Sequence, residues 1–380
     1  MGARFAFPLT PGVPMQAAVL REFNAPLRVE EVEIESPHAG EILVKLAASG
    51  VCRSDLHVQE GRSVVARLPM VLGHEGAGVV EEVGEGVTGF ATGDPVVIAL
   101  YGPCGECGEC RSGDITACMS ETRQNNMFGL MPDGTTRLSV GGEALHPMVG
   151  AGSLGEYTVV REAQAVKIPA DVSLDQACLT GCGVTTGVGA ALNTAAVKPG
   201  SNVAVVGCGG VGLNVVQGAR IAGATRILAV DLQTSKLDLA SDLGATEGVH
   251  IQPGESISEA ILARVPGGVD YAFEAIGKPD VVVEVFAATK SGGTAVMVGS
   301  PPAGEAIPVD GRLLFSDRKL MGCLGGGNIP QRDIPRLMGF LANGSLRIEP
   351  LISQRLRLDQ VNEAFDALRK GELARSVIVF

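Results

Sequence analysis

Tryptophan is absent from this chain, and aromatic residues make up only 4% of its 380 positions. The sequence also lacks any uninterrupted run of 18 or more apolar residues, which excludes a transmembrane helix. The first sixteen residues contain three prolines and no sustained apolar core, unlike a secretory signal. Ala6 stands where a myristoylation signal requires Ser or Thr. We therefore expect a cytoplasmic protein with no membrane partner, and a short extension before Met15.

Basic residues are fewer than acidic residues. The chain has 30 Lys and Arg but 42 Asp and Glu, which gives a formal net charge of −12. Such a charge repels nucleic acids and anionic membranes on average, and no cluster of Lys or Arg offsets it. We therefore expect a small-molecule partner and no nucleic acid. The hydrophobic fraction of 46% and the chain length allow two or three domains with large cores.

The nine cysteines are an odd number in a chain expected to be cytoplasmic, which disfavours a disulfide framework. Four of them share one segment with the spacing C-x2-C-x2-C-x7-C. Four thiolates can surround one tetrahedral zinc ion, and such a site is structural because it leaves no open position. The alternatives are two disulfides or an iron–sulfur cluster, although the bacterial ferredoxin run continues with another spacing. The predicted ligands of a zinc lobe at about 102–120 are Cys104, Cys107, Cys110 and Cys118.

The stretch 203–231 has the order of a dinucleotide-binding unit. A short apolar strand leads into Gly207, Gly209 and Gly212 in the pattern G-x-G-x-x-G, and a second apolar strand ends in Asp231. The glycines permit a tight turn, close approach of a pyrophosphate and close helix packing. A glycine-rich turn in an ordinary α/β protein is the alternative. The acid at the end suits the ribose hydroxyls of NAD and would repel the extra phosphate of NADP.

Closely spaced β segments over residues 15–100 predict a barrel-like β domain. We expect His74 to lie in a glycine-framed turn. Residues 102–155 are expected to be mostly irregular. Strands then alternate with helices over 203–325, as in a doubly wound parallel sheet. The helix candidates lie near 211–223, 234–243, 256–264 and 279–289, and two more follow at 330–345 and 359–370. We predict an α/β protein with a catalytic β domain at 1–183, a dinucleotide-binding domain at 184–325 and a return to the catalytic domain at 326–380.

A second group of possible metal ligands is dispersed along the chain, as Cys52, His74 and Cys182. Two Cys and one His leave a fourth tetrahedral position for water or substrate, which is the composition of a catalytic zinc site. On spacing alone this grouping is weak, because a buried Cys usually acts as a small hydrophobe and a lone His is more often structural.

Taken together, GVCRSDLH, GHEGAG, the four-cysteine lobe, TGCGVTTG, GCGGVG and the later VD resemble the zinc-dependent medium-chain alcohol dehydrogenases. The likeness is greatest to the branch with a long structural-zinc lobe, which includes class I and class III-like enzymes, and it runs from Met15 to Phe380. It implies a GroES-like β-barrel catalytic domain and a Rossmann coenzyme domain. It also implies two zinc ions per chain, with Cys52, His74 and Cys182 holding the catalytic one.

The resemblance assigns further residues to the catalytic side. Glu75 matches a carboxylate beside the zinc, and Asp55 matches the one that orients the ligand His. Ser54 matches the hydroxyl that takes the proton of the alcohol, and His57 matches the end of the relay that passes it to solvent. Tyr101 matches an aromatic residue that narrows the substrate pocket. Zinc at such a site acts as a Lewis acid that lowers the pKa of the alcohol.

On the coenzyme side the resemblance and the glycine pattern imply one set of residues around NAD. They are expected to hold the pyrophosphate, contact the ribose or pack near the nicotinamide: Arg53, Thr186, Gly207, Gly209, Gly210, Val211, Gly212, Asp231, Lys236, Val298 and Arg375.

The leading hypothesis is therefore an NAD-dependent zinc enzyme that interconverts a primary or secondary alcohol and its aldehyde or ketone. The alternative is a dehydrogenase for the hydroxymethyl adduct of formaldehyde with a thiol such as glutathione. Arg123 could bind the carboxylate of such a thiol, whereas Met127, Phe128 and Leu130 favour an apolar substrate. A non-catalytic protein that uses zinc and NAD for structure or sensing is a third hypothesis. The resemblance also implies a homodimer or homotetramer, with Ala295–Pro308 as the candidate edge that pairs.

Overall fold

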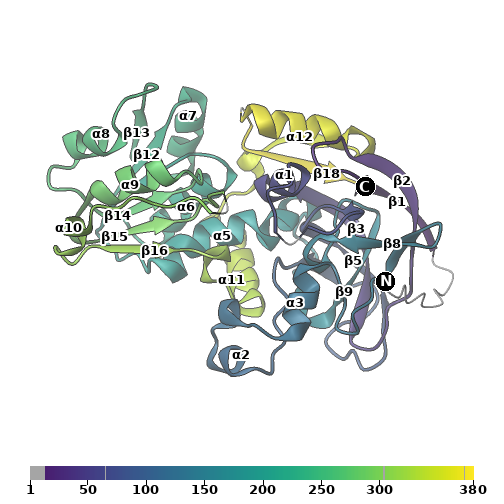
Figure 1. The fold of residues 1–380 in the computed structure, drawn as a ribbon. Coiled ribbons are helices and arrows are strands. Elements are labelled where there is room, and N and C mark those ends of the chain that lie inside the picture. The colour runs from purple at the N-terminus through teal and green to yellow at the C-terminus, as the bar shows by residue number, and fades with distance from the viewer. Residues whose placement is uncertain (1–12, 65, 303, 372) are drawn as a thin grey trace. The chain divides into compact units, whose positions relative to one another are not determined.

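The computed structural model describes residues 13–64, 66–302, 304–371 and 373–380, and it divides into two compact units (Figure 1). The first unit runs to Cys178 and also contains Arg355–Asp366 and Val377–Phe380, whereas the second consists of Leu179–Gln354 and Ala367–Ser376. Residues 326–354 thus group with the second unit, although the sequence placed them in a returning segment. Most of the expected N-terminal extension lies outside the described residues.

A closed five-stranded barrel forms one part of the first unit. Alternate residues of its first strand, including Met15, Ala17 and Val19, lie in one apolar core, as the two-residue period of a strand requires. Its strands are, in barrel order, β1 (Val13–Leu20), β2 (Arg28–Ile34), β7 (Leu138–Val140), β8 (Glu143–Pro147) and β4 (Met70–Val71).

A second sheet has seven strands. Its long strand β3 (Glu41–Val51) pairs with both β5 (Glu75–Val83) and β9 (Tyr157–Arg161). Since β5 begins at Glu75, the later part of the GHEGAG segment is strand, whereas Gly73 and His74 lie outside it and Gly73 has a φ of +92°. Small residues suit this strand because a side chain at Gly78 would overlap the backbone of β3. The remaining strands are β10 (Ala165–Lys167), β6 (Pro95–Ile98), β18 (Arg375–Val379) and β17 (Ile352–Leu356).

Residues 102–155 are more ordered than expected. They contain the helices α2 (Gly108–Ser112) and α3 (Glu121–Met127) as well as the barrel strands β7 and β8. Polar and glycine-rich composition concealed these short elements, because their stability comes from contacts with the rest of the unit rather than from local periodicity. Helices α1 (Arg53–Gln59) and α4 (Leu174–Ala177) also belong to this unit, as does the beginning of α12 (Val361–Lys370).

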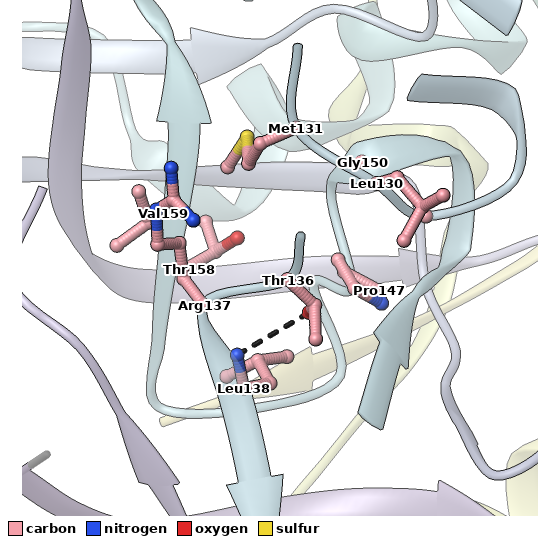
Figure 2. A pocket seen from close by; sticks show the side chains of 10 residues that line it. Leu130, Met131, Thr136, Arg137, Leu138, Pro147, Gly150, Thr158 and Val159 are labelled. Atoms are coloured by element: carbon pink, nitrogen blue, oxygen red, sulfur yellow. Dashed lines mark hydrogen bonds between the residues drawn. The ribbon is translucent and has the colours of Figure 1, made fainter. Parts of the chain in front are cut away.

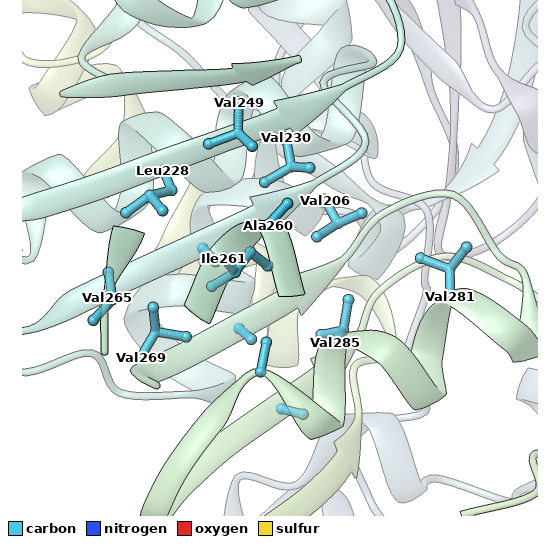
Figure 3. Packing of buried hydrophobic residues seen from close by; sticks show 14 of the residues in the cluster. Val206, Leu228, Val230, Val249, Ala260, Ile261, Val265, Val269, Val281 and Val285 are labelled. Atoms are coloured by element: carbon cyan, nitrogen blue, oxygen red, sulfur yellow. The ribbon is translucent and has the colours of Figure 1, made fainter. Parts of the chain in front are cut away.

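The second unit contains a six-stranded parallel sheet in the order β13-β12-β11-β14-β15-β16. This is the strand order of a Rossmann fold, so the predicted fold class is confirmed. Valines and other apolar side chains of the strands pack against the helices in a continuous core (Figure 3). The strands are β11 (Asn202–Val206), β12 (Arg226–Asp231), β13 (Glu247–His250), β14 (Val269–Glu274), β15 (Thr289–Met297) and β16 (Lys319–Gly322).

Six helices after residue 203 agree with the sequence-based expectation to within a few residues, whereas the helices Gly183–Gly189 and Gly311–Leu314 were not expected. Together these are the α-helices of the described residues after Cys182. They are α5 (Gly183–Gly189), α6 (Gly210–Ile221), α7 (Thr234–Leu243), α8 (Ile257–Arg264), α9 (Pro279–Ala287), α10 (Gly311–Leu314), α11 (Pro330–Ala342) and α12 (Val361–Lys370). None of the helices in the described part of the chain has both the length and the apolar character to span a bilayer.

The sheet edge differs from the prediction. Strand β15 is interior, because β16 pairs with it in parallel from Thr294 to Met297. Ala295–Pro308 is therefore not the edge of the sheet, and β16 takes that place. The sequence could not show this, since the four residues Lys319–Gly322 are too short a strand to be recognised from periodicity.

Candidate catalytic zinc site and coenzyme turn

The first ligand candidate, Cys52, caps the N-terminus of α1. The carboxylate of Asp55 reaches back to this cap, where its Oδ2 accepts a hydrogen bond from the backbone N–H of Cys52 at 2.8 Å. An acid at this position also suits the positive end of the helix. Both residues are buried, so the start of α1 is fixed in the interior of the first unit.

His74 is held by the same carboxylate. Asp55 Oδ1 lies 3.1 Å from His74 Nδ1 and accepts a further bond from the backbone N–H of Gly73 at 3.0 Å. The other ring nitrogen, Nε2, is fully buried and lacks a hydrogen-bond partner. Burial lowers the pKa of His74, but Asp55 and Cys52 outweigh it and raise the pKa to about 10. A proton on this ring would thus be displaced when a metal binds.

Four buried residues could supply one ligand atom each to a single metal ion. The ligand atoms of Cys52, His74, Glu75 and Cys182 all lie within 4.8 Å of one another. Two sulfurs, one imidazole nitrogen whose second nitrogen is held by a carboxylate, and a carboxylate oxygen fit zinc. Sequence reasoning placed Glu75 beside the metal rather than among its possible ligands. When bound, a zinc ion would polarise the oxygen of an alcohol or carbonyl.

Helix α1 also carries the two residues expected to move a proton. Ser54 is exposed, and its Oγ lies 3.9 Å from the Cys52 Sγ. His57 follows one helical turn later and is half-buried. Burial, with Arg53 nearby, lowers the pKa of His57 below its usual 6.5. His57 is therefore neutral at pH 7 and has a nitrogen available to accept a proton.

The four cysteines of the lobe form a second group of close ligand atoms. A tetrahedron with zinc–sulfur bonds of about 2.3 Å separates its sulfurs by about 3.8 Å. The Sγ of Cys104 lies 3.8 Å from that of Cys110 and 3.6 Å from that of Cys118. A hydrogen bond from Ser120, with two backbone N–H groups, lowers the pKa of Cys104 to about 6. None of the nine cysteines, all of which lie in the described residues, forms a disulfide, so the alternative of two disulfides is not what the structure contains.

The glycine turn joins β11 to α6 in the second unit. Gly207 has a φ of +92°, which favours glycine. A side chain at Gly212 would overlap the carbonyl oxygen of Gly207, whereas one at Gly209 would meet no atom within 4 Å. Gly209 thus faces open space at the start of a helix whose N-terminal N–H groups suit a phosphate.

Asp231 ends β12 and ties the turn together. Its Oδ2 accepts a bond from the backbone N–H of Cys208 at 2.8 Å, and its Oδ1 accepts one from Gln233 at 3.0 Å. Lys236 lies in the first turn of α7 and is half-buried. The carboxylate is thus fixed next to the turn by the backbone, with its charge available to further donors.

The other predicted coenzyme residues are distributed over several elements. The buried side chain of Arg375 packs against Gly210, where any side chain would overlap it. Arg53 is exposed on α1, and a set of half-buried residues lies on α5, α6 and the end of β15: Thr186, Val211 and Val298. Their contacts with a coenzyme remain a prediction.

Arg123 does not occupy the position expected for a carboxylate receptor. It is buried, and its Nη1 donates to the carbonyl oxygens of Ile115 at 2.8 Å and Thr116 at 2.7 Å. Its guanidinium also stacks 5.1 Å above the ring centre of Tyr101. The guanidinium therefore supports the zinc lobe, so the expectation that it could bind a thiol's carboxylate is not supported.

One cavity in the first unit lies in the barrel, lined by Leu130, Met131, Thr136, Arg137 and Thr158 among others (Figure 2). The two threonine hydroxyls donate to the carbonyl oxygens of Leu145 and Ala151. The guanidinium of Arg137 is held by Glu41. With its polar groups already satisfied, this cavity has little to offer a polar ligand.

The fold and the two ligand groups define a class of protein, a zinc-type oxidoreductase with a Rossmann domain. The model of the alcohol dehydrogenase GroES-like domain matches residues 38–170, and that of the zinc-binding dehydrogenase domain matches residues 210–343. The chain belongs to the zinc-dependent medium-chain alcohol dehydrogenase family.

Three relatives illustrate the range of the family. An S-(hydroxymethyl)glutathione dehydrogenase of Synechocystis is 40% identical over 365 residues, which is 96% of this chain and 99% of that protein. Benzyl alcohol dehydrogenase of Acinetobacter calcoaceticus is 33% identical with a TM-score of 0.91, covering 97% of this chain and 99% of that one. A zinc-binding dehydrogenase of Sinorhizobium meliloti, bound to NADP, is 27% identical with a TM-score of 0.80, covering 97% and 100%.

Proposed function

We propose that this chain catalyses the NAD-linked interconversion of a primary or secondary alcohol and its aldehyde or ketone. The observation that carries the proposal is the buried group of Cys52, His74, Glu75 and Cys182, with His74 held by Asp55. With Cys52, His74 and Cys182 as the ligands and Glu75 beside the metal, one position of a tetrahedral zinc stays open to substrate. A purely structural or sensory protein has no use for such an open position.

In this proposal the residues of α1 move the proton of the alcohol. Ser54 takes the proton from the substrate oxygen, and neutral His57 receives it and releases it to solvent. The lowered pKa of His57 suits this role, because the ring must be uncharged before it can accept. Asp55 acts through His74, since its hydrogen bond fixes the ring with Nε2 toward the metal position.

NAD is proposed as the coenzyme because of Asp231. Its carboxylate stands at the end of the second strand, the place where such an acid accepts hydrogen bonds from the ribose hydroxyls. The backbone bonds from Cys208 and Gln233 hold the carboxylate in that position. The extra phosphate of NADP would meet this negative charge. The NADP-bound relative does not decide the matter, since it is only 27% identical.

The thiol-adduct activity is the second candidate, favoured by the 40% identical relative that is named for it. Against it stands Arg123, whose guanidinium is engaged with the backbone of the lobe. A receptor for the carboxylates of glutathione would therefore have to come from other residues. We favour an alcohol with no thiol attached.

A substrate panel tests the proposal. The zinc-loaded protein would be assayed with benzyl alcohol, medium-chain alcohols and formaldehyde, each with and without glutathione, and with NAD or NADP. We expect turnover of alcohols without thiol, a preference for NAD and two zinc ions per chain. Turnover confined to formaldehyde plus glutathione would establish the second candidate. Binding of NAD with no turnover of any alcohol or aldehyde would contradict both.

The protein is also expected to form an oligomer and to act in one cellular compartment. We propose a homodimer or homotetramer in which β16, rather than Ala295–Pro308, is the strand edge that pairs. The exposed side chains of Leu314 and Phe315 just before β16 support this choice. We also propose that the protein acts in the cytoplasm, because nine cysteines outside any disulfide, four of them in one lobe, suit a reducing compartment.

A further inference from the structure

Two buried guanidinium groups hold the four-cysteine lobe, and one of them has no carboxylate partner among the described residues. Arg161 ends β9, and its guanidinium donates to the carbonyl oxygens of Gly102 and Pro103 just before Cys104. Gly102 leaves room for it, because a side chain there would overlap the guanidinium. Arg123, from α3, holds the other end of the lobe through Ile115 and Thr116.

A buried cation normally requires a negative partner, because removing it from water is costly. Arg161 is only 8% exposed. The nearest candidate along the paired strands is Glu41, which lies opposite Arg161 in the β3–β9 pairing. That carboxylate, however, is taken by Arg137 through two hydrogen bonds of 2.9 and 2.7 Å. The hydrogen-bond acceptors of the guanidinium within the described part of the chain are therefore carbonyl oxygens, which carry no full charge.

The ligand Cys104 directly follows Pro103, whose carbonyl oxygen accepts from Arg161, so this ligand lies next to a residue that the guanidinium holds. Burial lowers the pKa of Arg161, and the thiolates of Cys104 and Cys118 oppose this shift. Four thiolates around one divalent zinc ion leave a net charge of −2, by the sum of the ligand and metal charges. The metal-loaded lobe thus offers an anion to a cation that has no other counter-charge nearby.

We propose that Arg161 is the counter-charge of the four-cysteine zinc centre and that it strengthens zinc binding there through its charge. Outer partners of a metal site commonly change metal affinity 10–100-fold. This role concerns the structural centre only and goes beyond the proposed catalytic function.

Variants at Arg161 separate charge from hydrogen bonding. Arg161→Gln removes the charge but keeps an amide that can donate to a carbonyl, whereas Arg161→Lys keeps the charge and loses the planar fork. Arg111→Gln is the matched control, because Arg111 directly follows the ligand Cys110 but is exposed on α2, where solvent screens its charge.

The experiment follows zinc loss from the lobe in the full-length, zinc-loaded protein. A chelator, 4-(2-pyridylazo)resorcinol, removes zinc in the presence of iodoacetamide, and peptide mass spectrometry records how fast the four lobe cysteines become alkylated. Neither coenzyme nor alcohol is needed, so the result stands whether or not the proposed function is right.

We expect Arg161→Gln to accelerate alkylation of the lobe on the order of 10–100-fold, with Arg161→Lys close to the unsubstituted protein and Arg111→Gln unchanged. Equal acceleration by the Gln and Lys variants would mean that Arg161 acts only as a backbone clamp, and no acceleration by Gln would mean that its charge is irrelevant; either overturns the proposal. Should the Gln variant not fold, Arg161→Lys decides alone, since acceleration of that order by a charge-preserving change also overturns it.

Discussion

At the scale of single residues, Asp55 holds two members of the catalytic group in place through its hydrogen bonds. One fully buried carboxylate accepts hydrogen bonds from the backbone of Cys52 and Gly73 and from the ring of His74. It therefore positions two ligand candidates that lie 22 residues apart in the chain. The family motif placed this acid near the His, but only the folded strand-to-helix arrangement shows that it also holds Cys52.

We predict that Asp55→Asn loosens the catalytic zinc selectively. The amide lacks the charge and places an N–H where an acceptor is needed, so zinc affinity at this site should fall about 10–100-fold. Zinc counted after dialysis against a chelator should drop towards one ion per chain while the lobe cysteines stay protected from alkylation. Asp114→Asn, an exposed acid in the lobe, serves as the control and should retain both ions. Full retention by the Asp55 variant would contradict the assigned role.

His57 provides a prediction of pH dependence. Protonation of His57 blocks proton acceptance, so kcat/KM should fall as the pH drops through its pKa, which burial and Arg53 place below the usual 6.5. His57→Gln should lower the rate on the order of 10²-fold at pH 7 and remove this acidic limb. Initial rates between pH 5 and 9 would check both effects. A variant that keeps the limb would exclude His57 from the proton route.

At the scale of elements, the glycine turn requires glycine at two positions for two different reasons. Gly212 lacks room because the helix start lies against the Gly207 carbonyl, whereas Gly209 has free space in front of it. The pattern G-x-G-x-x-G predicted both positions. Only the folded structure distinguishes Gly212, which packing requires, from Gly209, which leaves space for a ligand.

Alanine at these two positions should therefore act differently. Gly212→Ala should cost about 1–3 kcal/mol of stability, because the added methyl forces the helix from the strand. Gly209→Ala should leave the melting temperature nearly unchanged and weaken NAD binding, since its methyl points into open space. Thermal unfolding and coenzyme titration by fluorescence measure the two effects. Equal loss of stability in both variants would contradict this distinction.

Element boundaries were predictable where apolar periodicity was strong and failed where it was weak. Helix α7 (Thr234–Leu243) was expected at its observed bounds. The first residues of β5, before Val79, were missed because their glycines are typical of turns, yet they are needed there to let β5 approach β3. The short edge strand β16 was missed because a strand of four residues forms through its pairing with the neighbouring strand β15, which the sequence pattern does not reveal.

At the scale of the whole molecule, the proposed contact with a second copy lies along β16, which ends the six-stranded sheet among the described residues. Phe315 is 93% exposed beside it, an unusual cost for a large apolar side chain. Exposed strand edges invite pairing with another chain. These features together locate the proposed contact between subunits outside the segment first expected.

Phe315→Lys should weaken self-association. Loss of a buried aromatic side chain at the contact corresponds to about 1.5–3 kcal/mol, or roughly 10–100-fold in the dissociation constant. Sedimentation velocity over a range of protein concentrations would show a shift toward smaller species. Val64→Lys changes an equally exposed residue of the first unit and should have no effect. An unchanged distribution for the Phe315 variant would place the contact elsewhere.

The sequence by itself determined the fold class, the glycine turn and the four-cysteine lobe, because glycine patterns and cysteine spacing express local requirements of backbone and metal. The dispersed set of Cys52, His74 and Cys182 was predicted only through the resemblance to the family. Tertiary structure alone decided that Glu75 joins the ligand group, that Arg123 supports the lobe, and that Arg161 lies against it. These contacts join residues far apart in the chain, so no local pattern could encode them. They depend on which side chains the folded sheets bring together and which charges burial leaves without a partner.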